Sequence, residues 1–249
     1  GYKAFYGCAG LTSAVIDSGV ADIGESAFEN CIGLNEITVP GSVTSIGEAA
    51  FRGCIGLKNA VIKSGVSKIE TYAFAGCAGL KKVEIENGLS TVGTAAFMDC
   101  GSLAEILLPG SLTEIGVSAF SGCESLTDIT IPGSVTKIGN TAFQNCGGLK
   151  KVTIENGVEN IGYRAFYNCG SLSRLTIPAS VKSTGEEAFR NCGSLSLLTI
   201  KDGAGSIGDS AFSGCGSLKR VVLPGSITAI GQKVFQNCGG LRSVKIEDG

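Results

Sequence analysis

Cysteine offers the most varied chemistry in this chain, because a thiolate can act as a nucleophile, bind a metal or form a disulfide. The 249-residue sequence contains eleven cysteines, and each lies 23 residues from the next. They are Cys8, Cys31, Cys54, Cys77, Cys100, Cys123, Cys146, Cys169, Cys192, Cys215 and Cys238. No CxxC pair or other short metal-binding spacing occurs among them. The constant interval therefore indicates a repeated structural unit.

The cysteines are expected to be buried free thiols that act as small apolar fillers in a core. Equivalent residues in stacked β-coils lie about 4.8 Å apart. A disulfide needs Cβ atoms separated by roughly 3.5–4.5 Å, so a straight stack is slightly too wide for one. Metal binding is the alternative, weakened by the lack of histidine and by the equivalence of the positions.

Catalytic chemistry has little support in the sequence. The chain contains no histidine, which excludes Ser-His and Cys-His dyads. Its glycines follow the 23-residue period and form no phosphate-binding loop ahead of a helix. We therefore predict a protein that is not an enzyme and that uses no cofactor or metal.

A short apolar segment precedes every cysteine. Each phenylalanine lies three residues before a cysteine, within the pattern x-x-A-F-x-x-C, in which Val234 replaces the alanine of the last coil. The segment predicts one turn of 3₁₀ or α-helix with the alanine and phenylalanine directed inward. The residue just before the cysteine is always Gly, Asn or Asp, as at Gly53, Asp99 and Asn145. These types tolerate left-handed backbone, so we predict a positive φ there.

The residues after each cysteine indicate β-structure. The pattern L-x-x-[VI]-x-[IL], as at Leu126, Ile129 and Ile131, alternates in the manner of a short strand. A turn of the Pro-Gly-Ser or the x-x-Gly type follows, and then [VL]-x-x-I-G predicts a second short strand or an extended segment. Proline at the end of a strand has no N–H to donate, so strand pairing should stop there.

These units predict a repeat solenoid, mainly β with short helical turns, made of eleven 23-residue coils and a parallel sheet along one face. The period has no insertion, so we expect a single solenoid domain over residues 1–249. The repeats at both ends are incomplete and no terminal caps are visible, which suggests a mature or trimmed piece of a longer protein. Uncapped coils would favour end-to-end self-association.

The repeat I-G-x-x-A-F-x-x-C-x-x-L-x-x-[VI]-x-[IL]-P-x-S-[VL] resembles the BspA-type leucine-rich repeat, also called the Treponema pallidum type, along the whole chain. The resemblance implies a right-handed leucine-rich repeat solenoid with its main sheet on the concave face. Family members are mostly surface or secreted proteins of host-associated bacteria, and some bind host extracellular proteins or mediate adhesion. A cell-surface or secreted location is thus implied, although the sequence shows no signal peptide. The family carries no shared catalytic residues and no fixed binding motif.

The side chains one, two and four residues after each leucine should point outward from the main sheet, and we call this surface the strand face. It carries ten basic and four acidic residues, a net charge of +6, whereas the remaining residues sum to −8. A basic face would attract an extracellular protein with an acidic surface or a polyanionic glycan, with affinity that falls as salt rises. The alternative is that these residues only solvate the sheet. The candidate partner-binding residues are Lys81, Lys82, Lys150, Lys151, Arg174, Lys219, Arg220, Arg242 and Lys245.

The strand face also holds a row of threonines, Thr130, Thr153, Thr176 and Thr199, at one position of four consecutive coils. The row reflects either β-propensity or contact with a glycan. No aromatic residues interleave with the basic ones, so nucleic acid is not expected. No apolar run is long enough for membrane insertion. We therefore predict an interaction or adhesion module that binds a host or neighbouring-cell macromolecule, with a passive spacer or an accessory repeat domain of a larger protein as alternatives.

Overall fold

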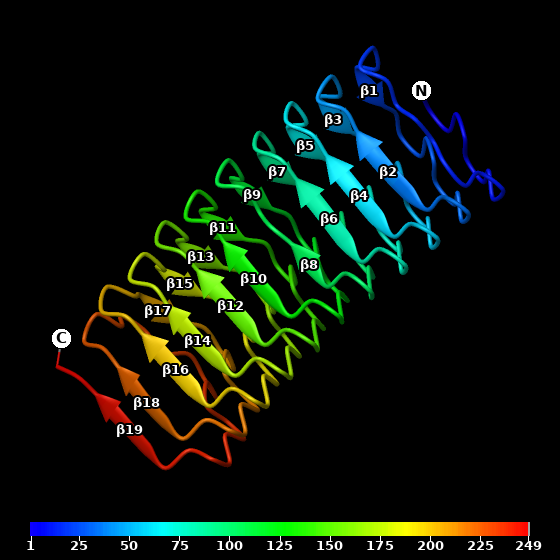
Figure 1. Cartoon of the computed structure of the whole chain (residues 1–249). Helices are drawn as coiled ribbons and strands as arrows, with labels where there is room; N and C mark the ends of the chain where they lie inside the picture. The colour runs from blue at the N-terminus through cyan, green and yellow to red at the C-terminus, as the bar shows by residue number, and fades with distance from the viewer. Residues whose placement is uncertain (249) are drawn as a thin grey trace.

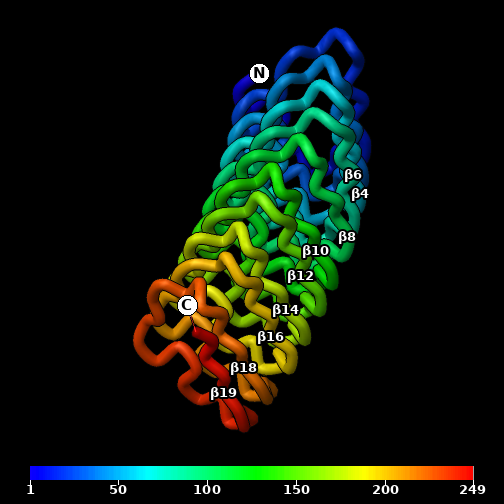
Figure 2. The backbone as a smooth tube through the Cα atoms, turned by 90° about the vertical axis from the view of Figure 1, so that its left-hand side faces the viewer, coloured from blue at the N-terminus to red at the C-terminus, as the bar shows by residue number. Residues whose placement is uncertain are grey.

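The chain forms a rod of stacked coils in which each 23-residue repeat makes one turn (Figure 1). The structure is a computed structural model and describes residues 1–248. The termini lie at opposite ends of the rod, and the tube view shows consecutive coils laid against one another from end to end (Figure 2). The fold is therefore the predicted parallel-strand solenoid.

Each coil contributes two kinds of strand. The [VL]-x-x-I-G segment is expected to form either a second short strand or an extended segment. It forms a two-residue strand in nine consecutive coils, and these strands pair into one nine-stranded parallel sheet. Its members are β1 (Asp22–Ile23), β3 (Ser45–Ile46), β5 (Lys68–Ile69), β7 (Thr91–Val92), β9 (Glu114–Ile115), β11 (Lys137–Ile138), β13 (Asn160–Ile161), β15 (Ser183–Thr184) and β17 (Ser206–Ile207). The strands that follow each leucine are β2 (Glu36–Val39), β4 (Asn59–Ile62), β6 (Lys82–Ile85), β8 (Glu105–Ile106), β10 (Asp128–Ile131), β12 (Lys151–Ile154), β14 (Arg174–Ile177), β16 (Leu197–Ile200), β18 (Arg220–Leu223) and β19 (Ser243–Ile246).

Apart from β19 at the end of the rod, where all four residues are exposed, the strands that follow the leucines have one buried and one exposed set of side chains. In β10, Ile129 and Ile131 are buried while Asp128 and Thr130 are exposed, as the alternation predicts. Inside the rod, equivalent phenylalanines of successive coils stack with ring centroids 5.0–5.7 Å apart. A single coil cannot bury its own apolar side chains, so each coil is stabilised by its two neighbours.

Proline divides these strands into three sheets, β2-β4-β6-β8, β10-β12-β14-β16 and β18-β19. We call the contact between the strands of two consecutive coils a junction. Where the strand of the later coil is not followed by proline, the two strands pair over four residues. Where the later coil has Pro109 or Pro178, pairing shrinks to two residues or to one, and where it has Pro132 or Pro224, the two strands belong to different sheets. The predicted loss of pairing at proline is thus confirmed, because proline has no N–H for the carbonyl of the preceding coil.

The proline coils gain a different contact in exchange. Two residues after Pro178 in the same coil, the Ser180 hydroxyl donates a hydrogen bond to the Val158 carbonyl (2.8 Å) and accepts one from the Gly157 N–H (3.0 Å). Ser111 and Ser226 bridge their own preceding coils in the same way. At these three prolines the consecutive coils therefore stay joined by a serine, which lies two residues after the proline that cannot donate a strand hydrogen bond.

The turn around each phenylalanine differs from the expected helical turn, because no helix forms within residues 1–248. In the second coil, the N–H groups of Ala27 and Cys31 donate to carbonyls three residues back, as in 3₁₀ geometry. The N–H groups of Ser26, Phe28 and Asn30 donate instead to carbonyls of the next coil, at 2.7–2.8 Å. This alternation requires left-handed backbone, with φ of 52° at Ser26 and 61° at Asn30, and left-handed residues interrupt a helix.

The residue before each cysteine has a positive φ in all eleven coils, as predicted. All eleven cysteines are free thiols, and ten of them are buried, while Cys8 in the first coil is exposed. Each buried thiol also donates a hydrogen bond to the main-chain carbonyl of the phenylalanine in the preceding coil, at 3.1–3.4 Å. The cysteines therefore fill the core as expected and, in addition, join consecutive coils.

Candidate functional site

All nine candidate residues of the strand face are exposed. Pairing between consecutive coils places equivalent positions side by side, so that Lys82 lies beside Glu105 and Lys151 beside Arg174. The positions predicted to point outward are thus solvent-accessible columns that run along the rod.

Acidic neighbours neutralise the N-terminal part of the strand face. The Lys82 ammonium group forms an ion pair with Glu84 at 2.9 Å, and the hydrogen bond with Glu84 raises the pKa of Lys82. The next two coils carry exposed Glu105 and Asp128 at the position of Lys82. Lys81 and Lys82 are therefore separated from the other seven candidate residues by two acidic coils.

The positive charges in the C-terminal part of the strand face are largely without acidic partners. Six exposed basic residues here make no ion pair with any residue in positions 1–248, and we call them the basic ridge: Lys150, Lys151, Arg174, Lys219, Arg220 and Arg242. Lys245, the ninth candidate, differs because it pairs with Glu247 at 2.7 Å. Lys81 also makes no ion pair among residues 1–248, but it lies beside the Lys82–Glu84 pair and apart from the ridge. Six of the nine candidates thus form one continuous region of uncompensated positive charge.

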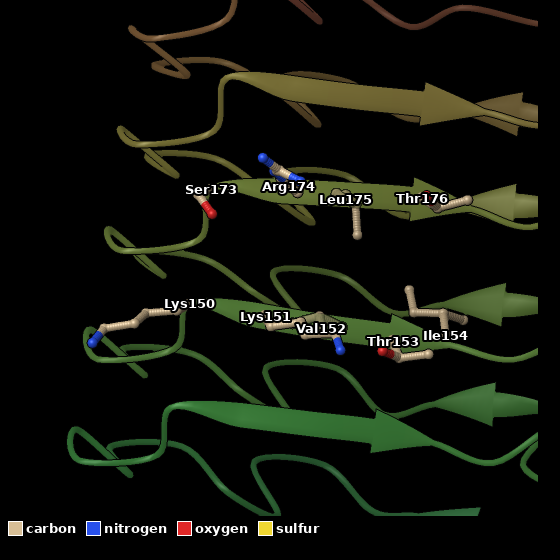
Figure 3. Close-up of a pocket in the computed structure, with 9 residues that line it drawn as sticks. All are labelled: Lys150, Lys151, Val152, Thr153, Ile154, Ser173, Arg174, Leu175 and Thr176. Atoms are coloured by element: carbon tan, nitrogen blue, oxygen red, sulfur yellow. The ribbon is translucent and has the colours of Figure 1, made fainter.

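A shallow depression of about 560 Å³ lies between β12 and β14 within the basic ridge. Lys150, Lys151 and Arg174 line it together with the hydroxyl side chains of Thr153 and Thr176 (Figure 3). A second depression of about 480 Å³ continues from it past the strand ends, where Ile154 and Thr176 line both. The sequence contains one signal for this feature, Pro178, because the junction that it interrupts keeps only the Lys151–Arg174 pair.

The buried thiols of the inner coils lack the properties of a reactive centre. Burial raises the pKa of Cys100, Cys146 and Cys192 to about 12, so these side chains are protonated at neutral pH. A nucleophilic or metal-binding cysteine needs a lowered pKa and access to its reactant. No group of three or more potential metal ligands occurs within the described part of the chain.

A second cluster of ionisable groups lies on the phenylalanine turns, away from the strand face. Glu187 is 7% exposed and forms ion pairs with Arg164 and Arg190. Although burial opposes the shift, hydrogen bonds from these two arginines hold the pKa of Glu187 below its usual value. The Arg164 guanidinium also lies over the rings of Tyr163 and Tyr167, at 4.9 and 5.1 Å from their centroids. The Glu187 carboxylate is paired within this cluster, whereas the buried Arg190 Nε has no hydrogen-bond partner among the described residues. The ion pairs join consecutive phenylalanine turns, which indicates a structural role.

Comparison with known proteins identifies the repeat. The family model described as the BspA type leucine rich repeat region matches residues 1–127 and 113–242, with six copies. The chain belongs to the BspA-type leucine-rich repeat family. A search of curated proteins finds no match.

Solved structures of bacterial leucine-rich repeat proteins resemble this BspA-type chain. A leucine rich cell surface protein from Faecalibacterium prausnitzii is 29% identical, with a TM-score of 0.58, and the match covers 91% of this chain and 64% of that one. The T. pallidum leucine rich repeat protein is 25% identical, with a TM-score of 0.54, over 84% of this chain and 78% of that one. A leucine-rich repeat protein from Bacteroides ovatus is 26% identical, with a TM-score of 0.50, over 90% and 82%. The BspA-type chain thus spans less than two thirds of the Faecalibacterium protein.

The ends of the BspA-type rod differ from its middle. Phe5 and Val15 at one end, and Val244 and Ile246 at the other, are between 47% and 88% exposed. The end-to-end self-association expected from uncapped coils stays a prediction. No helix within residues 1–248 is long and apolar enough to cross a membrane.

Proposed function

We propose that this chain is a non-enzymatic interaction module of a bacterial cell-surface or secreted protein. It binds a host or neighbouring-cell macromolecule through its strand face and so serves adhesion. The observation that carries the proposal is the basic ridge, a set of exposed cations without ion-pair partners among residues 1–248. Uncompensated charge of one sign raises the rate and the specificity of association with a partner of the opposite sign.

The repeat pattern supports the same surface. Buried positions recur almost unchanged from coil to coil, because every coil must fit its two neighbours. The outward positions of the strands vary instead between lysine, glutamate, threonine and apolar residues. The residues that vary on an otherwise constant scaffold can determine which partner a repeat protein binds. Such a partner binds along an extended surface rather than in a pocket.

The proposed location follows from likeness. The Faecalibacterium protein is described as a cell surface protein, and this chain shares 29% identity with it over 91% of its own length. The proposed partner is an extracellular protein or a polyanionic glycan. Nucleic acid is not proposed, because the outward strand positions carry no aromatic residue on which bases could stack.

The test is a binding screen of the whole chain against immobilised matrix proteins, mucin and sulfated glycans. We expect saturable binding to at least one of them, and loss of that binding in a variant carrying Lys150→Glu, Lys151→Glu, Lys219→Glu and Arg220→Glu. Saturable binding that the quadruple variant retains would show that the strand face is not the binding surface. A chain that binds nothing saturably would instead be a passive spacer.

A further inference from the structure

The basic ridge follows the axis of the rod. Register pairs place Lys151 beside Arg174 and Arg174 beside Leu197, and the next coil along contributes Lys219 and Arg220. Consecutive coils are about 4.8 Å apart, so the cations from β12 to Arg242 extend over four steps, or roughly 19 Å. The ridge is thus a line of charge suited to a linear ligand that lies along the rod.

The surroundings of the ridge favour a polar ligand. Specific protein interfaces place aromatic and apolar anchors at their centre. The outward positions of the strands carry no aromatic residue, and Leu197 is the one exposed apolar side chain at these positions within the ridge. Val244 and Ile246 are exposed as well, at inward positions of the last strand. Thr153, Thr176 and Thr199 form a parallel row two residues further along the strands, where their hydroxyls can exchange hydrogen bonds with a polyhydroxylated chain.

The depression between β12 and β14 supplies a recess on this line. Lys150, Lys151 and Arg174 line it, with Thr153 and Thr176 beside them. The Lys150 ammonium group extends sideways from the gap between the strands, and the Arg174 guanidinium group lies on the side of β14 that faces β16 (Figure 3). The three residues lie at the border of the recess, and their long side chains can rotate toward an anionic group that enters it, such as a sulfate or a carboxylate, because charge-assisted hydrogen bonds from lysine and arginine are strong. A flat row of charges would offer no such fixed point.

We propose that the basic ridge binds a linear polyanionic glycan, which bears sulfate or carboxylate groups on successive sugars and lies along the rod axis from β12 to the coil of Arg242. One anionic group occupies the depression between β12 and β14, and the threonine row contacts sugar hydroxyls. This inference rests on the proposed function and names the partner class for its surface.

The first test measures the binding of heparin fragments of increasing length to the whole chain by titration calorimetry. Affinity should rise with fragment length and level off once the fragment covers about 19 Å, the length of the ridge. It should also fall by at least roughly tenfold between about 0.05 M and about 0.3 M salt, because salt screens exposed charges. Affinity that is independent of length would contradict a ligand lying along the axis.

The second test locates the site with charge-reversed variants of equal charge change. A variant with Lys150→Glu and Lys151→Glu should bind heparin about tenfold more weakly or worse. The equivalent variant with Lys81→Glu and Lys82→Glu should lose less than about threefold, because Glu84 and the acidic coils already reduce the attraction there. The control variant carries Lys68→Glu and Lys137→Glu, two exposed positions of the nine-stranded sheet, and should bind nearly as the parent does.

A polyglutamate peptide with the same number of charges as the heparin fragment separates the two partner classes. The proposal expects the peptide to bind more weakly than heparin, because it lacks the hydroxyl contacts. Equal or tighter binding of the peptide would overturn the glycan assignment. If heparin does not bind while a matrix protein binds saturably through the strand face, the glycan inference fails and the proposed function stands. If neither binds, both fail.

Discussion

The Cys77 thiol donates a hydrogen bond to the main-chain carbonyl oxygen of Phe51, which lies in the preceding coil, at 3.1 Å. The same oxygen accepts the N–H of Cys54 within its own coil at 3.2 Å. One carbonyl therefore closes the phenylalanine turn of one coil and holds the cysteine of the next. A cysteine at this position fills space and satisfies a buried acceptor at once, which gives a physical reason for its recurrence in all coils.

Removing this thiol should destabilise the rod. A Cys77→Ala variant loses a weak hydrogen bond and leaves a small cavity in a region that is fully buried, so we expect a loss of about 1–2 kcal/mol in the free energy of unfolding. The measurement is urea denaturation followed by circular dichroism. Cys8→Ala is the matched control, because Cys8 is exposed and should change stability by less than about 0.5 kcal/mol. Equal losses in the two variants would rule out the role assigned to the buried thiol.

Stability should fall at alkaline pH because of the buried thiols. Burial raises the pKa of Cys100 and Cys146 from the ordinary value of 9.0 to about 12. The folded state therefore holds protons that the unfolded state releases, so the stabilisation is complete below pH 9 and is lost as pH rises from 9 towards 12. Each such thiol costs about 1.4 kcal/mol per pH unit in that range.

The alkaline prediction is checked by comparing unfolding free energies at several pH values for the parent chain and a Cys100→Ala, Cys146→Ala variant. The variant should show a shallower decline, corresponding to two fewer protons released on unfolding. Other groups also titrate above pH 9, but they do so equally in both proteins. Identical slopes would mean that these thiols ionise as readily in the folded chain as in the unfolded one.

Alanine at Gly157 should destabilise the coil that precedes Pro178. Gly157 has a φ of +115°, and a Cβ there would lie 2.0 Å from the Gly133 carbonyl oxygen. Backbone strain and the clash together should cost about 2 kcal/mol or more. Gly147→Ala is the control, because a Cβ at Gly147 meets nothing within 4 Å. Thermal denaturation of both variants tests this, and a tolerated Gly157→Ala change would show that the turn can adopt another conformation.

Replacing Pro178 with alanine should restore a strand hydrogen bond at the interrupted junction. The new N–H can donate to the Ile154 carbonyl, as the Lys201 N–H donates to Ile177 at 3.0 Å in the next coil. Net stability should change by less than about 1 kcal/mol, because the added hydrogen bond is offset by the greater freedom of the unfolded chain. Hydrogen exchange should show the new amide protected to the degree of the Lys201 amide, and exchange at the rate of an unstructured peptide would exclude the bond.

The fold could largely be predicted from the sequence, because every coil of a solenoid has the same local structure and the same kind of contact with its neighbours. The left-handed residue before each cysteine, the strand after each leucine and the loss of pairing at proline all follow from residue types with narrow conformational preferences, such as Asn145, Ile129 and Pro132. The candidate site was predicted only as a set of outward columns. Whether the charge of a lysine is compensated depends on neighbours such as Glu84 and Glu247, whose side-chain directions the pattern does not show.

The sequence by itself determined the period, the core positions and the face on which variation is permitted. The tertiary structure alone decided the second left-handed position of each coil, which is occupied by residues as different as Ala49, Tyr72, Arg164 and Glu187. No side chain there favours a positive φ. The conformation is imposed because alternate N–H groups of the turn must reach carbonyls of the next coil, as Ala49 reaches Thr71 at 2.9 Å. Hydrogen bonding between coils therefore replaces the helical turn that local sequence preference predicted.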